Sequence, residues 1–268
     1  MSAIRSRANP RVRRWRALAA DARARRREGC ALIEGPRLVA EYLERIGAPA
    51  ALLVGESRLR EPRIAKLAAR QASVGLHVLP DALLGYVCDV ETPAGIAAEI
   101  RIPGARGRLP ESPGCVFLEG IQDAGNLGAI LRSAAAFGIR DAVLAKGGAD
   151  PWSPKVLRAA MGAHFMMSIA EVADLGAALE RFGGMTIAAV AAGGTRPQNL
   201  DLSGRVGWVF GREGGGLSEA LARRCAARCT IEMPGGSESL NVAAAAAILF
   251  YERSAQLSRH GARSGAPA

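Results

Sequence analysis

The chain has 268 residues, of which 49% are hydrophobic, and a formal net charge of +10. No apolar run reaches the length of a membrane span and the N-terminus lacks the apolar core of a signal peptide, so we expect a soluble protein without membrane contact. Five cysteines, an odd number without zinc-knuckle spacing, favour reduced thiols in the cytoplasm over a disulfide framework or a metal site. The length favours two domains.

Most of the positive charge lies at the N-terminus. Residues 1–30 contain ten arginines against two acidic residues, Asp21 and Glu28. A basic block of this kind commonly steers a protein to nucleic acid. A solvated basic helix and a mitochondrial transit peptide are the alternatives.

The first block of the chain, residues 1–101, has the alternating pattern of a small α/β domain. Helices are expected at 10–27, Pro36–Ile46, 59–70 and 81–87. Strands are expected at Cys30–Glu34, Ala51–Val54, Leu76–Val78 and Gly95–Ile100. Residues 102–114 are dense in proline and glycine, which is typical of an interdomain linker.

The second block, residues 115–258, again alternates strands and helices. Strands are expected at Cys115–Leu118, Ala142–Ala145, Met185–Ala191, Val206–Phe210 and Cys229–Met233. Helices are expected at Asn126–Phe137, 154–162, 173–182, 217–227 and 239–254. Strands this apolar predict a mainly parallel sheet covered on both faces. Residues 259–268 are expected to be a disordered tail.

Three glycine-rich segments of the second block follow predicted strands, at 120–128, 211–216 and 234–239. Ligands of parallel sheets bind outside the carboxyl ends of the strands, so we expect these segments to converge on one site. None of them has the spacing of a dinucleotide or P-loop fingerprint. A nucleoside triphosphate or NAD site is therefore disfavoured, although backbone groups there could hold an adenosine moiety.

Three ordered motifs carry a family resemblance. They are Asn-Leu-Gly-Ala-Ile-Leu-Arg-Ser-Ala-Ala-Ala-Phe-Gly at 126–138, Val-Phe-Gly-Arg-Glu-Gly-Gly-Gly-Leu-Ser at 209–218, and Ile-Glu-Met-Pro at 231–234 with Ser-Leu-Asn-Val at 239–242. Their order, spacing and helical context resemble those of the SpoU (TrmH-like) RNA ribose 2'-O-methyltransferases.

The first block resembles the L30e-like substrate-binding domain of the same family. The matching pieces are Asn9-Pro10, Ile33–Val39 and Glu91–Ile96. The resemblance thus covers nearly the whole chain, and it makes the basic arm part of the domain instead of a transit peptide.

The resemblance implies a specific α/β fold, a cofactor and an assembly. A trefoil-knotted, mainly parallel-sheet methyltransferase domain (SPOUT) would follow the small L30e-like α/β domain. The cofactor would be S-adenosyl-L-methionine, and the protein would be a homodimer through the methyltransferase domain. Chain connections are normally unknotted, so the knot is implied by the resemblance alone.

The resemblance also implies the site residues. Catalytic roles fall on Arg132, Asn126, Glu213, Ser239 and Asn241. Cofactor contacts fall on Gly211, Gly214, Gly216, Ile231, Met233 and Leu240. Contacts with RNA are expected from Arg11, Arg13, Arg14, Arg25, Arg26 and Arg37. No metal is expected.

Several of these residues have two interpretations. A guanidinium has a pKa above about 12 and is a poor base, so Arg132 would either clamp an RNA phosphate or take the proton once desolvated. Asn126 and Ser239 lie at helix starts, where each could cap the helix or contact the ligand. His164, set among apolar residues, is expected to be structural and not a general base.

The predicted activity is methylation of a ribose 2'-hydroxyl in RNA, with ribosomal RNA, and 23S in particular, favoured as substrate. A tRNA methyltransferase and an antibiotic-resistance rRNA methylase are alternatives within the family. A non-catalytic, ribosome-associated RNA-binding protein would explain the basic arm but not the combination of motif residues. A Rossmann-fold methyltransferase or dehydrogenase would lack the late motifs.

Overall fold

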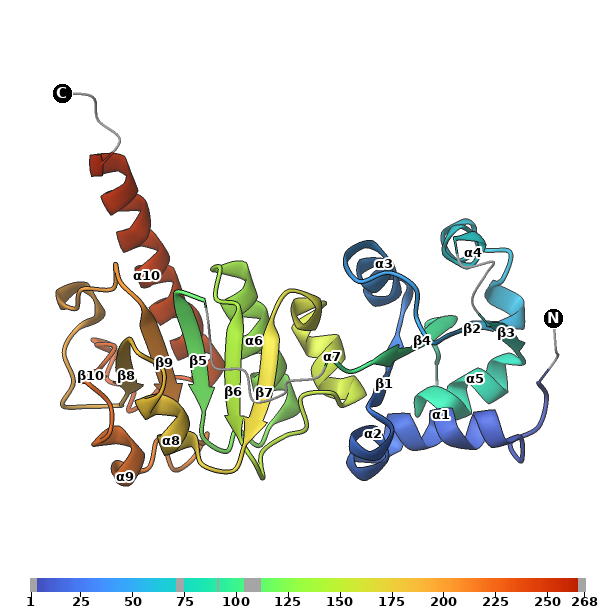
Figure 1. Ribbon diagram of the computed structural model, residues 1–268, viewed down its shortest axis with the longest axis horizontal. Coiled ribbons are helices and arrows are strands. Elements are labelled where there is room, and N and C mark those ends of the chain that lie inside the picture. Colours follow the sequence, from blue (N-terminus) through green and yellow to red (C-terminus); the bar gives the residue numbers. More distant parts are fainter. Residues whose placement is uncertain (1–3, 71–74, 91, 104–111, 265–268) are drawn as a thin grey trace. The chain divides into compact units, whose positions relative to one another are not determined.

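The computed structural model describes residues 4–70, 75–90, 92–103 and 112–264. The chain forms two compact units (Figure 1). Unit 1 consists of Met1–Gly104 and Asp150–Phe165, and unit 2 of Ala105–Ala149 and Met166–Ala268. The segment Asp150–Phe165 therefore belongs to unit 1, whereas the sequence pattern assigned it to the second block. Most of the predicted linker 102–114 lies outside the described residues.

A four-stranded mixed sheet forms the centre of unit 1. Its order is β1-β4-β2-β3, with β4 antiparallel to both β1 and β2, and β2 parallel to β3. The strands are β1 (Cys30–Glu34), β2 (Ala51–Gly55), β3 (Leu76–Leu79) and β4 (Ile96–Arg101). The predicted small α/β domain is confirmed.

The helices of unit 1 follow the sequence pattern, with one exception. They are α1 (Pro10–Ala20), α2 (Ala22–Glu28), α3 (Pro36–Arg45), α4 (Pro62–Ala69), α5 (Asp81–Cys88) and α7 (Pro154–Ala160), with 3-10 turns η1 (Glu56–Arg58) and η2 (Ala163–Phe165). The single basic helix expected over 10–27 is divided at Asp21, which has an extended backbone and accepts a hydrogen bond from the Arg23 amide. An aspartate that can cap a helix therefore starts a new one here.

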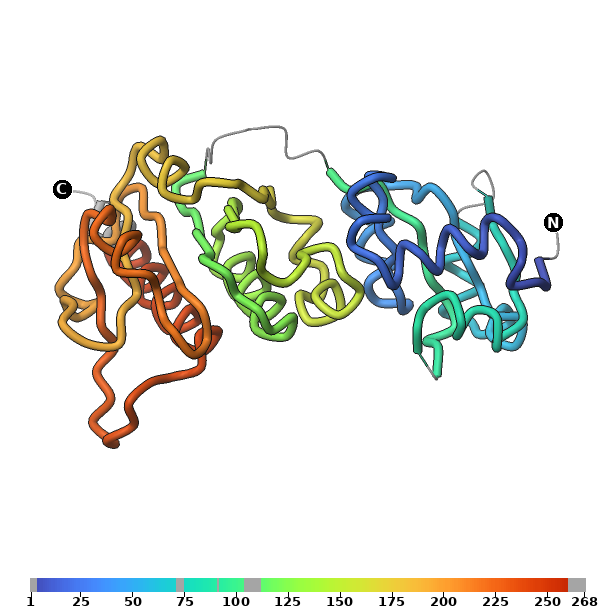
Figure 2. Tube along the Cα trace, turned by 90° about the horizontal axis from the view of Figure 1, so that it is seen from below, coloured from blue at the N-terminus to red at the C-terminus, as the bar shows by residue number. Residues whose placement is uncertain are grey.

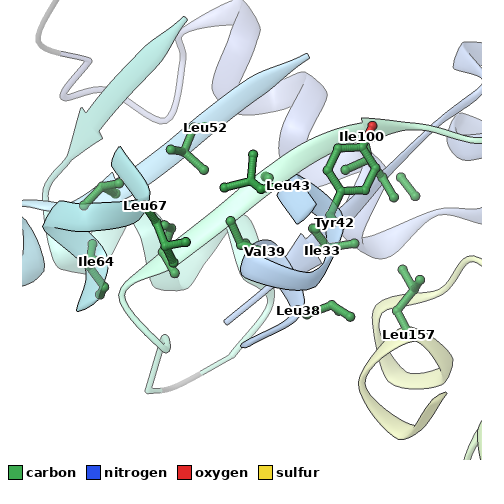
Figure 3. Packing of buried hydrophobic residues seen from close by; sticks show 14 of the residues in the cluster. Ile33, Leu38, Val39, Tyr42, Leu43, Leu52, Ile64, Leu67, Ile100 and Leu157 are labelled. Carbon is green, nitrogen blue, oxygen red and sulfur yellow. The ribbon is translucent and has the colours of Figure 1, made fainter. Parts of the chain in front are cut away.

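Both faces of this sheet are covered. Alternate residues of each strand point to opposite faces, so Ala31 and Ile33 pack with α3 and α4, whereas Cys30 and Leu32 pack with α1 and α5. Trp152 and Leu157 join the α3 side of the core, where Figure 3 shows Leu157 beside Leu38. Burial of these two side chains is the physical reason that Asp150–Phe165 belongs to unit 1.

Unit 2 is built on a six-stranded sheet in which every pair is parallel, in the order β10-β8-β9-β5-β6-β7. The strands are β5 (Gly114–Leu118), β6 (Asp141–Ala145), β7 (Ser168–Val172), β8 (Met185–Ala189), β9 (Val206–Phe210) and β10 (Ala227–Cys229). The predicted mainly parallel sheet is confirmed; the trefoil knot stays a prediction. The strand expected over Cys229–Met233 is wrong, because β10 ends at Cys229 and both Ile231 and Met233 line a cavity instead.

Helices cover both faces of the parallel sheet. They are α6 (Ala124–Ala136), α8 (Leu175–Glu180), α9 (Glu219–Ala222) and α10 (Val242–Ser264), with a 3-10 turn η3 (Pro197–Asn199). On one face α8 and α9 pack on Phe117 and Val209. On the other, Phe250 of α10 meets Phe210 of β9 edge to face, with ring centroids 5.8 Å apart.

The last helix differs from its predicted bounds at both ends. It begins at Val242, not at 239, and continues to Ser264, so part of the expected tail 259–268 is helical; 265–268 lie outside the described residues. Across the described parts of the chain, no helix combines the length and apolarity needed to cross a membrane.

Candidate functional site

The loop 211–217 after β9 is folded tightly on itself. The backbone amides of Arg212 and Gly216 each donate to the carbonyl of the other, at 3.0 and 2.9 Å. A Cβ on Gly211 would overlap the Gly216 carbonyl and the Leu217 amide, and Gly216 itself has φ +64°. Both positions therefore require glycine.

Glu119, directly after β5, holds the far end of this loop. Its two carboxylate oxygens accept hydrogen bonds from the amide and the hydroxyl of Ser218, each at 2.7 Å. The sequence interpretation missed Glu119. An acidic residue immediately after a buried strand was the available signal, because such residues lie at the carboxyl edge of the sheet.

Three polar side chains from the three motifs meet beside the loop. The side-chain nitrogen (Nδ2) of Asn126 donates a hydrogen bond to the Glu213 carboxylate at 3.1 Å. The Nδ2 of Asn241 in turn donates to the side-chain oxygen (Oδ1) of Asn126 at 2.9 Å. Glu213 also accepts hydrogen bonds from the backbone amides of Gln122 and Asp123, at 3.2 and 3.0 Å. We call Asn126, Glu213 and Asn241 the polar cluster.

The helix caps at this site differ from those expected. The side chain of Asp123 caps α6 by accepting a hydrogen bond from the backbone amide of Asn126 at 2.8 Å. Asn241 caps α10 by accepting from the amides of Ala243 and Ala244, at 2.9 and 3.3 Å. The predicted capping roles of Asn126 and Ser239 are therefore wrong, and the side chain of Asn126 is used to join the other two motifs.

Glu213 is an ionised carboxylate in this setting. Desolvation by itself would raise the pKa of its carboxyl group, but hydrogen bonds from the Asp123 amide, the Asn126 side chain and the Gln122 amide outweigh it and lower the pKa below the usual value. The charge is thus held by donors and not by a basic side chain.

A cavity of about 370 Å³ opens between the loop 211–217 and the segment before α10. Figure 2 shows that segment, between β10 and α10, as a long projecting loop. All six predicted cofactor contacts line the cavity, as do Glu213 and Ser239. They are Gly211, Gly214, Gly216, Ile231, Met233 and Leu240. Its size is that of a small-molecule site.

Arg132 stands apart from this arrangement. It is exposed on α6 and makes no hydrogen bond or ion pair with any residue that the structure describes. Ser239 lines the cavity, and its carbonyl accepts from the Ser237 hydroxyl at 3.0 Å. The structure thus brings together Asn126, Glu213 and Asn241, and it places Ser239 in the cavity that Glu213 also lines. The guanidinium of Arg132 has no hydrogen-bond partner among the described residues.

Comparison with known proteins identifies this unit. Residues 113–251 match the model of the SpoU rRNA Methylase family, the segment that carries the cluster and the cavity. The chain belongs to the SpoU family. Residues 9–98 of this SpoU-family protein match a second model, the MRM3-like substrate binding domain. The resemblance stated from the motifs is confirmed.

Relatives and solved structures agree with this assignment. The protein is 31% identical over 253 residues to the 23S rRNA (guanosine(2553)-2'-O)-methyltransferase RlmP of Bacillus subtilis, which covers 94% of this chain and 98% of that protein. The SpoU methyltransferase AviRb of Streptomyces viridochromogenes, solved with AdoMet, is 26% identical with a TM-score of 0.82, covering 92% of this chain and 98% of that one. An AdoMet-bound rRNA methyltransferase from Sinorhizobium meliloti is 26% identical with a TM-score of 0.81, covering 97% and 98%.

The arginines expected to contact RNA fall into two groups. Arg11, Arg13, Arg26 and Arg37 are exposed on unit 1 of the SpoU-family protein. Arg25 is only 4% exposed and donates to Asp150 at 2.7 Å and to the carbonyls of Leu18 and Ala19, so its prediction as an RNA contact is wrong. A buried guanidinium with its donors bonded is a structural group.

Arg14 is also engaged within unit 1. It donates to the buried carboxylate of Glu99 at 2.7 Å and pairs with Glu28, and these hydrogen bonds raise the pKa of the Arg14 guanidinium. Trp15 donates to the other oxygen of Glu99 at 2.8 Å. Arg14 therefore anchors α1 on β4, and its contribution to RNA contact stays a prediction.

Two basic residues that share a surface with Arg37 were not among the predicted RNA contacts. They are Arg63 and Arg158, which line a cavity of about 300 Å³ in unit 1 together with Arg37 and Glu34; we call it the basic cavity. Arg158 also lies 3.4 Å from Glu34. Because Arg158 follows Arg37 by more than one hundred residues, nothing local in the sequence indicated that the two share a surface.

His164 is a core residue. It is 1% exposed, its Nε2 lies 2.7 Å from the Pro151 carbonyl oxygen, and its ring packs on Trp152 at a centroid distance of 4.9 Å. Burial lowers the pKa of the imidazole to about 4. The ring is therefore neutral at physiological pH and holds the segment Asp150–Phe165 in place, in line with the structural interpretation.

Proposed function

We propose that this protein transfers a methyl group from S-adenosyl-L-methionine to a ribose 2'-hydroxyl in RNA, with 23S ribosomal RNA the favoured substrate. The observation that carries the proposal is the polar cluster of Asn126, Glu213 and Asn241 at a cavity formed by the glycine loop, because Glu213 belongs to both. The RlmP relative, similar over almost its whole length, acts on 23S rRNA by its name.

The cavity suits the cofactor in size and in chemistry. Its walls combine the exposed backbone of Gly214, Gly215 and Gly216 with the apolar side chains of Ile231 and Leu240. Backbone groups would bind the polar edges of an adenosine, and the apolar side chains would cover its faces. When bound, the cofactor supplies an electrophilic methyl group on a sulfonium.

The protein's own groups must then orient the ribose hydroxyl and assist the loss of its proton. The side chains of the polar cluster are held in place, since each is hydrogen-bonded to another member. The cluster would therefore form a rigid surface beside the ribose. Arg132, exposed on α6 and without a hydrogen-bond or ion-pair partner among the described residues, has donors to offer. It either clamps an adjacent phosphate or takes the hydroxyl proton once desolvated.

RNA would be held by unit 1. The exposed Arg11, Arg13 and Arg26 line its first two helices, and Arg37 and Arg63 lie at the basic cavity. Their donors suit a phosphate backbone, which supplies much of the affinity in protein–nucleic acid complexes.

We also propose that two copies associate through unit 2. On α10, Ile248 is 42% exposed and Tyr251 62% exposed, and Ala244 lies on the same side of the helix by its spacing. An apolar stripe of this kind is covered in a stable protein, and a second copy of the chain would cover it. Light scattering should give twice the monomer mass for the wild type and the monomer mass for Ile248→Asp; a monomeric wild type would refute the dimer.

The proposed activity is tested by incubating the protein with radiolabelled S-adenosyl-L-methionine and either ribosomal RNA or tRNA. We expect label in ribosomal RNA and not in tRNA. Label in tRNA alone would make the tRNA alternative correct. Measurable cofactor binding without transfer to either RNA would favour the non-catalytic, ribosome-associated RNA-binding protein.

A further inference from the structure

A second cavity of unit 1, of about 450 Å³, opens beside Tyr86 on α5. Its lining includes Arg7 from the segment before α1, Arg16 from α1, Asp81 and Tyr86 from α5, and Pro93 from the segment before β4. None of these residues belongs to the polar cluster or to the basic cavity around Arg37.

Two guanidinium groups lie against the one aromatic ring. The Cζ atom of Arg7 is 4.4 Å from the centroid of the Tyr86 ring, and that of Arg16 is 5.2 Å away. Arg16 is fixed in place, because it donates to the Tyr86 carbonyl at 3.1 Å and pairs with Asp89 at 2.5 Å. Arg7 is exposed and, within the described residues, contacts no hydrogen-bond acceptor or carboxylate. Its donors therefore face solvent next to an aromatic surface.

Two carboxylates belong to the lining: Asp89, which pairs with Arg16, and Asp81. Asp81 begins α5 and is exposed, and one of its oxygens accepts a long hydrogen bond of 3.4 Å from the Ser57 amide. Its other oxygen has no partner among the residues that the structure describes. One turn further along the same helix, Gly85 lets the chain after α5 approach closely, since a Cβ there would lie 3.2 Å from the Val90 carbonyl oxygen. Pro93 also lies beside Gly85 and adds an apolar surface to the lining.

This set of groups matches an unpaired nucleotide. Bases that leave the RNA stack are held on aromatic rings or on guanidinium planes and are read by hydrogen bonds at their edges. Here the Arg7 guanidinium, which lies over the Tyr86 ring at 4.4 Å, provides the stacking surface. Asp81 has oxygens that accept hydrogen bonds, and Arg7 has donors for a phosphate. Among the four bases, guanine presents two neighbouring donors, its ring N–H and its amino group, to one carboxylate.

We propose that the cavity around Tyr86 binds one unpaired nucleotide of the RNA substrate, with guanine the preferred base. The inference rests on the proposed function only in taking RNA as the substrate. It concerns recognition by unit 1 and requires no step of the methyl transfer. With aromatic residues at 4% of the chain, Tyr86 is a rare aromatic surface on a basic domain.

The test measures binding of fluorescent single-stranded RNA octamers to the full-length protein, with a central guanine or uracil in an otherwise identical sequence. We expect tighter binding of the guanine octamer by the wild type. Tyr86→Leu should weaken it about tenfold, the loss typical of one stacked base, whereas Tyr86→Phe should retain it. Arg7→Ala should reduce the slope of log Kd against log salt by about one, with Arg60→Ala, which removes an exposed arginine outside the cavity, as the matched control.

Circular dichroism and the melting temperature show whether each variant is folded. Equal affinity of folded wild type and Tyr86→Leu for the guanine octamer, or equal losses for Arg7→Ala and Arg60→Ala, would overturn the inference. Equal affinity of the wild type for guanine and uracil octamers would remove the base preference and so contradict the proposal. Failure of the methyl-transfer assay, with these binding differences present, would count against the proposed function and not against this pocket.

Discussion

At the scale of single residues, Asn126 is the centre of the site. It receives a hydrogen bond from Asn241 and gives one to Glu213, and these partners lie 115 and 87 residues away in the sequence. Because Asp123, and not Asn126, caps the helix, the side-chain amide of Asn126 is available for these two hydrogen bonds. Each motif thus contributes one side chain, and the three motifs depend on one another for their geometry.

Asn241 has two functions that substitution can separate. Asn241→Ala removes both the cap of α10 and the bond to Asn126, and we expect it to cost about 1 kcal/mol of stability through the cap. Asn241→Asp keeps a capping oxygen but lacks the donor to Asn126. It should therefore retain the wild-type melting temperature while methyl transfer falls. Equal melting temperatures for all three proteins would show that Asn241 does not cap the helix.

The pH dependence of cofactor binding follows from Glu213. Because its folded-state pKa is lowered from 4.5, its hydrogen bonds stabilise the site above that value and are lost as pH falls through the lowered pKa. Calorimetric affinity for S-adenosyl-L-methionine should stay constant from pH 7 to about 5 and decline only in stronger acid. Glu213→Gln should bind more weakly at pH 7 and lack that decline; a wild-type affinity that falls between pH 7 and 5 contradicts this account.

At the scale of elements, the loop 211–217 determines the shape of the cavity. Its backbone turns back so closely that Gly211 touches Gly216 and Leu217, and Glu119 fastens its end through Ser218. A single added methyl group is enough to test this, because unit 2 contains glycines in very different surroundings.

Gly211→Ala should abolish cofactor binding, since the new Cβ would displace the opposite side of the loop. Gly204→Ala is the matched control, because a Cβ there meets nothing within 4 Å, its backbone is not left-handed, and the residue does not line the cavity. We expect Gly204→Ala to bind within about twofold of the wild type, a change of less than about 0.5 kcal/mol. Similar losses for both variants in equilibrium dialysis would mean that glycine at 211 has no special role.

The strands that could be predicted from the sequence are those whose residues are buried in the sheet itself. The central strands β5, β6 and β9 are continuous apolar runs and were predicted almost to the residue. Strand β7 was missed because Ile169 is its one buried residue, so its sequence lacks an apolar run. The strand expected at Cys229–Met233 was misplaced because the apolar side chains of Ile231 and Met233 line the cavity and do not belong to the sheet. Motif resemblance predicted members of the candidate site, but caps and cross-links such as Glu119–Ser218 depend on distant contacts.

At the scale of the whole molecule, the two units are not consecutive in sequence. Asp150–Phe165 leaves the parallel sheet after β6, contributes α7 to unit 1 and returns to β7. Local periodicity predicted the helix but could not show which core it joins. The insertion means that a cut at the linker would remove Trp152 and Leu157 from the core of unit 1.

Leu157→Ala should therefore destabilise unit 1, although residue 157 lies within the segment that matches the methylase family. A fully buried leucine replaced by alanine typically costs about 2–5 kcal/mol. Hydrogen exchange should accelerate in β1 and α3 while the amides of β5 and β9 keep their wild-type rates. Faster exchange confined to unit 2 would show that the segment belongs with the parallel sheet.

Ribose methylation by the site in unit 2 can be measured by mass analysis of the nucleosides in treated RNA. Ribosomal RNA is incubated with S-adenosyl-L-methionine and either the wild type or Arg132→Ala, then digested to nucleosides. We predict a new 2'-O-methylated nucleoside with the wild type, and at least about 100-fold less with Arg132→Ala at unchanged cofactor affinity. A methyl group found on a base, or equal product from both proteins, would contradict the account.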